Sequence, residues 1–259
     1  MSGWVRAYLL VGAAQGIIIG VTGMLRPEHV IGFPLPTTPL NVRFAAAFYL
    51  AGALGLILSA ASRAAVDARI FVVGFIIVTA LLLIATIWYW DDFTVNGTPW
   101  AWLLSYIFEP LIGVVVILYL RLQAAAEPGR HRWSLLFQVQ AGVFGVVGIL
   151  LLAVPSRVAA HWPWALTSVL GRVYAAIFLA YAVGALLAAG ERRAQAVRPF
   201  AASSLCFLAG AAVASLIHHD RLVSGAPTIV WVGCLAVGIV ALGAAVLDLY
   251  RPRRELVTA

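Results

Sequence analysis

Apolar residues occupy the chain in long runs that are separated by short polar segments. A membrane-spanning helix needs about 20 consecutive apolar residues, and eight runs in this chain reach that length. The expected spans are 4–25, 42–61, 69–90, 100–121, 133–154, 167–189, 199–217 and 227–250. The pattern therefore predicts an all-α integral membrane protein with eight transmembrane helices.

Composition and charge agree with this class and predict an orientation. The chain is 63% hydrophobic and 10% charged, with a mean hydropathy of +1.01, which is outside the range of soluble domains. All 17 basic residues are arginines, and twelve of them fall on the side of the N-terminus, against five on the other side. Because positive charge collects on the cytoplasmic side, we expect both termini to be cytoplasmic, in the plasma membrane of a bacterium.

The second half of the chain resembles the first. Residues 43–55 align with residues 172–184 at an offset of 129, and seven of the 13 columns are identical. Residues at the expected helix boundaries recur at about the same offset, in the pairs Pro27 and Pro155, Arg69 and Arg198, and Pro99 and Pro227. Since four helices is an even number, the two halves have the same orientation. We expect two parallel four-helix membrane repeats, residues 1–126 and residues 127–259.

The shared unit is a helix that ends in proline, an aromatic–proline loop, and an arginine that opens a helix rich in alanine and glycine. It is carried by Pro27, Phe33, Pro34, Arg43 and Gly52, and again by Pro155, Trp162, Pro163 and Arg172. This unit resembles the small four-helix DoxX-like membrane proteins. The resemblance covers about half of each repeat and implies a helical bundle, without an activity that can be transferred to particular residues.

Glu109 is the one acid that lies deep inside an apolar run, and Pro110 follows it. A carboxylate at that depth costs about 2.5–3.5 kcal/mol on insertion scales unless it is neutral or paired. Proline removes one backbone donor and leaves a carbonyl near Tyr106 without its helical partner. Glu109 is therefore the first candidate for a functional residue.

A polar layer is predicted around Glu109 from helix geometry. At 1.5 Å per residue, Glu109 lies about 13 Å, Tyr49 about 11 Å and Gln15 about 15 Å below the outer ends of their helices. The candidate ligand-binding residues are Gln15, Arg43, Tyr49, Thr86, Tyr106 and Glu109. Arg43 is the nearest cation that could pair with Glu109, although it could instead extend to the headgroups. Under the repeat, Gln15, Tyr49 and Glu109 correspond to the apolar residues Val143, Phe178 and Val237.

Histidines and acids gather at the outer ends of two predicted helices. His218 and His219 follow one helix, and Asp91 and Asp92 follow another. Imidazole and carboxylate groups together can bind zinc or copper. No spacing typical of a metal site is present, and interfacial polar residues near an aromatic belt explain the same pattern. We therefore predict no metal and no cofactor.

Three functional hypotheses remain. The first is a non-catalytic polytopic membrane protein, such as an accessory subunit of a membrane complex, in which Glu109 has a structural partner. The second is a carrier or receptor for a small lipophilic or ionic ligand. The third is an intramembrane enzyme that acts on a lipid-like substrate with Glu109 as general acid or base. The expected partners are the bilayer and a second membrane protein or a second copy of the chain, and no feature indicates nucleic acid.

Overall fold

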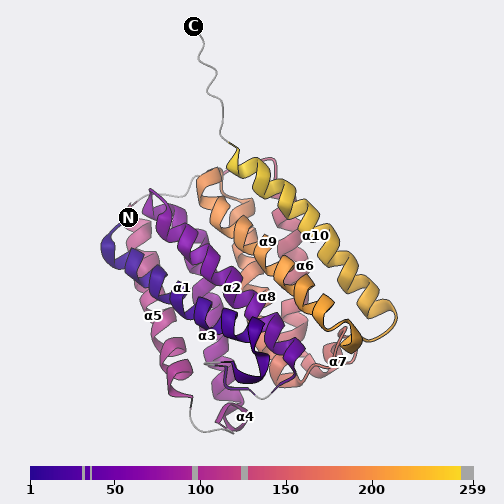
Figure 1. The fold of residues 1–259 in the computed structure, drawn as a ribbon. Helices are drawn as coiled ribbons and strands as arrows, with labels where there is room; N and C mark the ends of the chain where they lie inside the picture. The colour runs from indigo at the N-terminus through magenta and orange to yellow at the C-terminus, as the bar shows by residue number, and fades with distance from the viewer. Residues whose placement is uncertain (31–32, 36, 95–98, 124–127, 252–259) are drawn as a thin grey trace.

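Long helices joined by short connections make up the fold (Figure 1). The computed structural model describes residues 1–30, 33–35, 37–94, 99–123 and 128–251. The long helices are α1 (Gly3–Leu25), α2 (Pro39–Ala61), α3 (Arg69–Trp88), α5 (Trp100–Gln123), α6 (Ser134–Ala153), α8 (Ser168–Ala189), α9 (Ala194–Ile217) and α10 (Ala226–Tyr250). Two short helices, α4 (Trp90–Thr94) and α7 (Pro155–Ala159), and the 3₁₀ turns Pro27–His29, Ala65–Ala68 and His219–Arg221 lie between them.

Eight helices in the described residues are long and apolar enough to cross a membrane, which confirms the predicted class. Their bounds differ from the expected ones by a few residues. The largest difference is at α9, which begins at Ala194 rather than at residue 199 and contains Pro199. The third span ends at Trp88 rather than at residue 90, because Tyr89 leaves the helical conformation before α4 begins.

Side-chain caps determine where two of the central helices begin. Thr38 precedes α2 and accepts a hydrogen bond from the backbone N–H of Asn41, and Pro39 occupies the first helical position. Thr167 caps α8 in the same way by accepting from the N–H of Leu170 at 3.2 Å. A threonine cap satisfies one of the backbone donors that a helix start leaves free. The two helices that will form the centre of the bundle therefore start with the same local structure.

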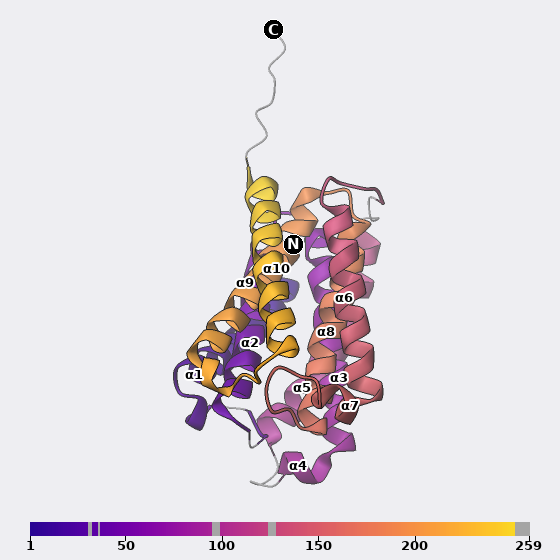
Figure 2. The same ribbon diagram turned by 90° about the vertical axis from the view of Figure 1, so that its right-hand side faces the viewer.

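The long helices pack as two layers, which Figure 2 shows edge-on. In one layer α1 packs on α2, α2 on α9, and α9 on α10. In the other layer α5 packs on α3, α3 on α8, and α8 on α6. Each layer therefore takes two helices from each half of the sequence, and the two halves share one apolar core.

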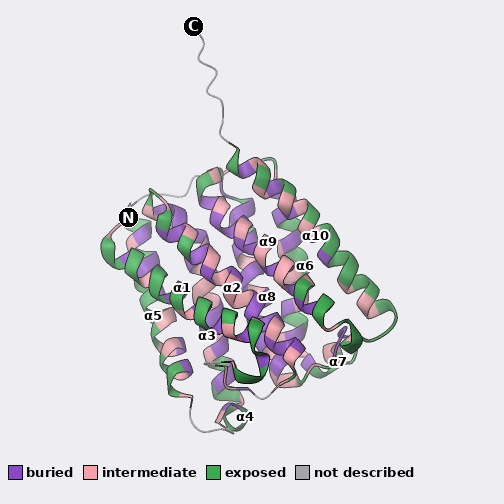
Figure 3. Ribbon diagram, viewed as in Figure 1, coloured by how far each residue is buried: buried purple, intermediate pink, exposed green. Residues whose placement is uncertain are grey.

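Burial follows this arrangement (Figure 3). The central helices α2 and α8 are the most buried of the candidate spans, whereas the outer helices α5, α6 and α10 are the least buried. The exposed side chains of the outer helices are large and apolar, as Leu118, Val146 and Val240 illustrate. Apolar side chains on an outer face are what a lipid environment favours.

A cluster of charged side chains joins the two halves at the end of the bundle that is uppermost in Figure 1, here called the upper end. Arg193 forms ion pairs with Asp67 at 3.4 Å and with Glu191 at 3.1 Å, and Arg69 contacts Glu191 at 3.4 Å. Only 3% of Asp67 and 2% of Glu191 is exposed. Burial and hydrogen bonds act in opposite directions on Glu191. Burial favours the neutral acid, but hydrogen bonds from Arg193 and the charges of Arg193 and Arg69 outweigh it and lower the pKa of Glu191.

Candidate functional site

A small cavity lies between α1, α2, α3 and α5, in the space between the two layers. Its volume is about 40 Å³, and Gln15, Tyr49, Tyr106 and Glu109 line it together with Thr79, apolar residues and glycines. The structure thus brings together four of the six residues predicted as a polar layer. A site of this volume has room for about two or three water molecules. We call it the Glu109 cavity.

The Glu109 carboxylate has no ion pair or hydrogen bond with any residue that the structure describes. It lies near enough to the hydroxyls of Tyr8, Tyr49 and Tyr106 to interact with all three electrostatically. The Gln15 amide is likewise without a hydrogen-bond partner in the described part of the chain. A carboxylate and an amide that are partly buried in this way offer acceptor and donor atoms to a bound molecule.

Tyr8 is a site residue that sequence reasoning missed. Its hydroxyl donates to the backbone carbonyl of Glu109 at 3.0 Å. Gly113 makes this approach feasible, because a Cβ at that position would lie 2.8 Å from the Tyr8 hydroxyl oxygen. The helical spacing of Tyr8, Gly12 and Gln15 places all three on one face of α1, and this spacing is the signal that could have identified Tyr8.

Tyr49 and Tyr106 connect the two layers beside Glu109. Their hydroxyls are 2.6 Å apart and form a hydrogen bond in which either can donate. Trp102 packs edge-on against Tyr106, with ring centroids 4.5 Å apart. The tyrosine pair therefore fixes the distance between α2 and α5 at the depth of the carboxylate.

Thr86 and Arg43 do not belong to the cavity. Thr86 accepts from the indole N–H of Trp102 at 2.9 Å and donates to the carbonyl of Leu82 at 2.8 Å, so its hydroxyl has partners outside the cavity. Arg43 donates through Nε to the Met24 carbonyl at 3.0 Å and contacts His218 through its terminal nitrogen. Of the two directions left open for Arg43, the structure shows the one toward the end of its helix, and Arg43 forms no pair with Glu109.

Arg172, the counterpart of Arg43 in the second half, also stays at the lower end of the bundle. Its guanidinium lies over the rings of Trp88 and Tyr89, at 4.8 and 5.2 Å from their centroids. Aromatic faces attract such a cation. Both arginines thus find local partners near the ends of their helices, as long side chains do at a membrane interface.

A second cavity of about 40 Å³ adjoins the Glu109 cavity. The two share Phe48, Gly52, Phe75 and Val78 as lining residues, and the second extends toward Tyr181 of α8. A Cβ built on Gly52 would meet no atom of the described chain within 4 Å. The space between the layers therefore continues from Glu109 toward the centre of the bundle.

The four residues considered for a metal do not assemble into a site. His218 faces Arg43, and burial, followed by the charge of Arg43, lowers the pKa of His218. His219 contacts the carbonyl of Leu216, and Asp91 and Asp92 lie in α4. In the described segments no three histidine, cysteine, aspartate or glutamate side chains are grouped so that they could hold a metal ion.

Comparison of the chain with models of protein families, with curated protein sequences and with solved structures finds no match. The fold and the cavity define the class, which is an all-α protein with eight candidate membrane spans and a carboxylate in a cavity between them. The resemblance to DoxX-like proteins stays a prediction.

Proposed function

We propose that the chain is a non-catalytic polytopic membrane protein that binds a small lipophilic or ionic ligand in the Glu109 cavity. The observation that carries this proposal is that Glu109 and Gln15 line one cavity and neither side chain is paired with a described residue. An isolated ionised carboxylate at this depth is costly, so Glu109 is either protonated or held by a partner that the described residues do not supply. A bound molecule supplies that partner.

The lining residues favour a particular ligand chemistry. Glu109 accepts hydrogen bonds when it is ionised, the tyrosine pair can accept or donate, and the Gln15 amide does both. Phe48 and Phe75 provide apolar walls. The ligand that fits carries one hydrogen-bond donor or positive charge, such as an amine, at the end of a small apolar body.

The position of the cavity suggests a route from the lipid. The cavity lies between α1 of one layer and α5 of the other, and each of these helices packs mainly within its own layer. A ligand larger than the cavity would separate α1 from α5 while its donor group reaches Glu109. Entry from the side is a common solution for lipophilic molecules that partition into the bilayer.

We also infer two parallel four-helix repeats, with both termini cytoplasmic in a bacterial plasma membrane. Recurring contacts support the repeat. A Cβ at Gly20 would meet Leu50 as one at Gly148 would meet Leu179, and Gly55 and Gly184 lie against Phe71 and Phe200 in the same manner. The arginine distribution remains the argument for the orientation.

Two equivalent tryptophan hydrogen bonds align the fourth helices of the two repeats at an offset of 129. Trp102 donates to Thr86 at 2.9 Å, and Trp231 donates to Ser215 at 2.9 Å. This pairing makes Gly238 the counterpart of Glu109, in place of Val237. The carboxylate thus corresponds to a position without a side chain.

The test is to compare the molecules that purified variants retain. Wild type, Glu109→Gln and Asp91→Asn are purified in mild detergent, and the bound small molecules are identified by mass spectrometry. Asp91→Asn makes the same chemical change at a distant acid. Loss of one hydrogen bond to a charged group weakens binding by roughly 10- to 100-fold, so we expect Glu109→Gln alone to lose a retained molecule while it still folds. Its melting temperature should fall only by the stabilisation that the lost ligand supplied.

A second variant tests the cavity rather than the charge. Gly52→Leu fills space that is open in the structure, and we expect it to fold normally and to retain less ligand. Two results would contradict the proposal. One is an identical set of retained molecules in all four proteins, and the other is a Glu109→Gln protein that fails to fold, which would indicate a structural role.

A further inference from the structure

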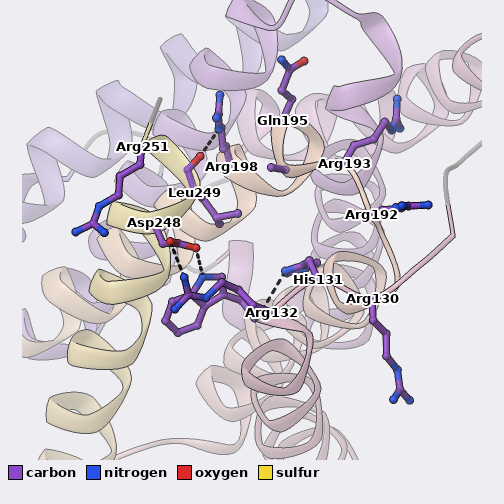
Figure 4. Close-up of a pocket in the computed structure, with 12 residues that line it drawn as sticks. Arg130, His131, Arg132, Arg192, Arg193, Gln195, Arg198, Asp248, Leu249 and Arg251 are labelled. Atoms are coloured by element: carbon purple, nitrogen blue, oxygen red, sulfur yellow. Dashed lines mark hydrogen bonds and ion pairs between the residues drawn. The ribbon is translucent and has the colours of Figure 1, made fainter. Parts of the chain in front are cut away.

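A large cleft opens at the upper end of the bundle, where α6 and α9 begin and α10 ends (Figure 4). Its volume is about 950 Å³. Trp133 and Leu249 contribute apolar surface, and six arginines are among the residues that line it: Arg130, Arg132, Arg192, Arg193, Arg198 and Arg251. We call this the arginine cleft.

Acids among the described residues do not balance the charge of the arginine cleft. Asp248 is the single acid among the lining residues, and Arg193 is neutralised by Asp67 and Glu191, so the other five arginines against one aspartate leave a net charge of +4. The two oxygens of Asp248 are already used, because they accept from Arg132 at 2.8 Å and from the indole of Trp133 at 2.9 Å. The cleft is therefore a strong attractor for anions.

The arginines divide into those that are held in place and those that are available. Arg193 is committed to Asp67 and Glu191, and Arg198 donates to the Leu249 carbonyl at 2.7 Å while its guanidinium lies 5.3 Å from the Tyr250 ring centroid. The guanidinium groups of Arg130, Arg192 and Arg251 have no hydrogen bond or ion pair with the residues that the structure describes. In Figure 4, Arg130 and Arg192 lie on one side of the cleft and Arg251 lies on the other.

The arginine cleft lies at the level expected for lipid headgroups, and this position favours the phosphate of a lipid over other anions. Its lining residues come from the ends of three candidate membrane spans, where the apolar region gives way to headgroups. Trp133 and Tyr250 lie at this level, as amphipathic aromatic side chains do at a membrane interface. A phosphate group at that depth belongs to a phospholipid, and basic recesses between spans bind anionic headgroups.

We infer that the arginine cleft binds the phosphate of an anionic phospholipid from the leaflet that surrounds the upper end. Guanidinium groups suit this ligand because they form bidentate hydrogen bonds with phosphate oxygens. Leu249 and Trp133 would contact the glycerol and the first methylene groups. This site is separate from the Glu109 cavity and goes beyond the proposed function.

The test uses the full chain in a zwitterionic detergent and measures its melting temperature and the lipids retained in native mass spectrometry. Dioleoyl phosphatidylglycerol is compared with dioleoyl phosphatidylcholine, which has the same acyl chains, and with inorganic phosphate. We expect phosphatidylglycerol alone to raise the melting temperature and to remain bound. Equal effects of both lipids would refute an anion site, and an equal effect of inorganic phosphate would refute the assignment to a lipid.

The variant Arg130→Gln/Arg192→Gln removes two arginines that make no described hydrogen bond or ion pair, so it should fold as wild type does. Each basic residue near an anionic headgroup changes the affinity by about five-fold, so the double variant should bind phosphatidylglycerol roughly 30-fold more weakly. Arg121→Glu is the matched control, since it changes the net charge equally at the end of α5, outside the cleft. Unchanged binding in the double variant, or an equal loss in the control, would overturn the inference.

Discussion

The space between the two helix layers differs from one side of the bundle to the other. On the side of α1 and α5, small residues and polar groups leave the Glu109 cavity. On the side of α8 and α9, aromatic rings occupy the space. Tyr181 of α8 stacks on Phe207 of α9 with centroids 5.0 Å apart, and Phe144 of α6 lies 6.1 Å from Tyr181. The comparison shows that the same arrangement of helices can enclose a cavity or a filled core, depending on its side chains.

The difference can be traced to individual positions under the proposed repeat. Gly16 corresponds to Phe144 and Gly52 to Tyr181. A glycine at each position in the first half removes about the volume that a ring occupies in the second. Because protein interiors are packed at nearly uniform density, two such replacements are enough to open or close a small cavity.

Polar groups follow the same contrast. In the second half the amide of Gln140 donates to Ser204 at 3.1 Å, and the Tyr181 hydroxyl is 2.9 Å from that of Ser203. In the first half Gln15 and Glu109 have no such partner among the described residues. Unpaired polar atoms also occur in the second half, where one oxygen of Gln140 has no described partner. The proposed ligand site therefore depends on the cavity that half-buried Gln15 and Glu109 line, and not on the missing partners alone.

The largest effect is expected where the two halves are tied together, at Glu191. Glu191→Ala would leave Arg193 and Arg69 without their shared acid, and we expect the free energy of unfolding to fall by about 2–3 kcal/mol, below the full value for a buried pair because both arginines are partly exposed. Unfolding by increasing amounts of a denaturing detergent, followed by the loss of helical circular dichroism, measures this free energy. Asp220→Ala breaks an exposed pair with Arg221 and should cost less than about 1 kcal/mol. Equal losses would mean that the buried cluster does not hold the halves together.

Acid should weaken the same cluster in wild type. The pKa of Glu191 is lowered from 4.5 in the folded protein, so its contribution to stability is complete above pH 4.5 and is lost as the pH falls through the lowered value. We expect wild type to lose stability faster than Glu191→Gln below pH 4.5. Melting temperatures measured between pH 7 and pH 3 check this, and parallel curves for the two proteins would contradict it.

Much of the fold could be predicted from the sequence, because hydrophobic length alone determines a membrane span. The layer of Gln15, Tyr49, Tyr106 and Glu109 followed from helical rise. The direction of the Arg43 side chain could not be predicted from helical rise, because this long side chain could reach the Met24 carbonyl or Glu109 from the same Cα position. Pairing between distant helices was also out of reach, because it depends on how the two halves interleave.

The charged cluster at Asp67 and Glu191 shows the same limit. Each acid lies in a connection between helices, where the sequence suggests an ordinary solvated residue. The two become buried only because α3 packs on α8 and α2 packs on α9. No local pattern contains that information.

A smaller effect should test whether the two halves share their close helix contacts. A Cβ at Gly20 would lie 2.6 Å from Cγ of Leu50, and one at Gly148 would lie 2.8 Å from Cγ of Leu179. We expect Gly20→Ala and Gly148→Ala each to cost about 1–3 kcal/mol through overpacking. Gly142→Ala, whose Cβ meets no described atom within 4 Å, is the control and should be within about 0.5 kcal/mol of wild type. A large loss in only one half would break the proposed equivalence.

The smallest effect concerns the paired tryptophan hydrogen bonds, which test the repeat at the depth of the polar layer. Thr86→Val and Ser215→Ala each remove the acceptor of a tryptophan N–H. Hydrogen bonds between membrane helices contribute about 0.6 kcal/mol on average, so we expect losses near that value and within about 0.5 kcal/mol of each other, which is the usual error of additivity. Double-mutant cycles with Trp102→Phe and Trp231→Phe isolate the two couplings.

Thr22→Val is the control, since the Thr22 hydroxyl donates only to carbonyls of its own helix. Coupling in one half and none in the other would mean that the two tryptophans are not equivalent, and the assignment of Gly238 as the counterpart of Glu109 would fail with it.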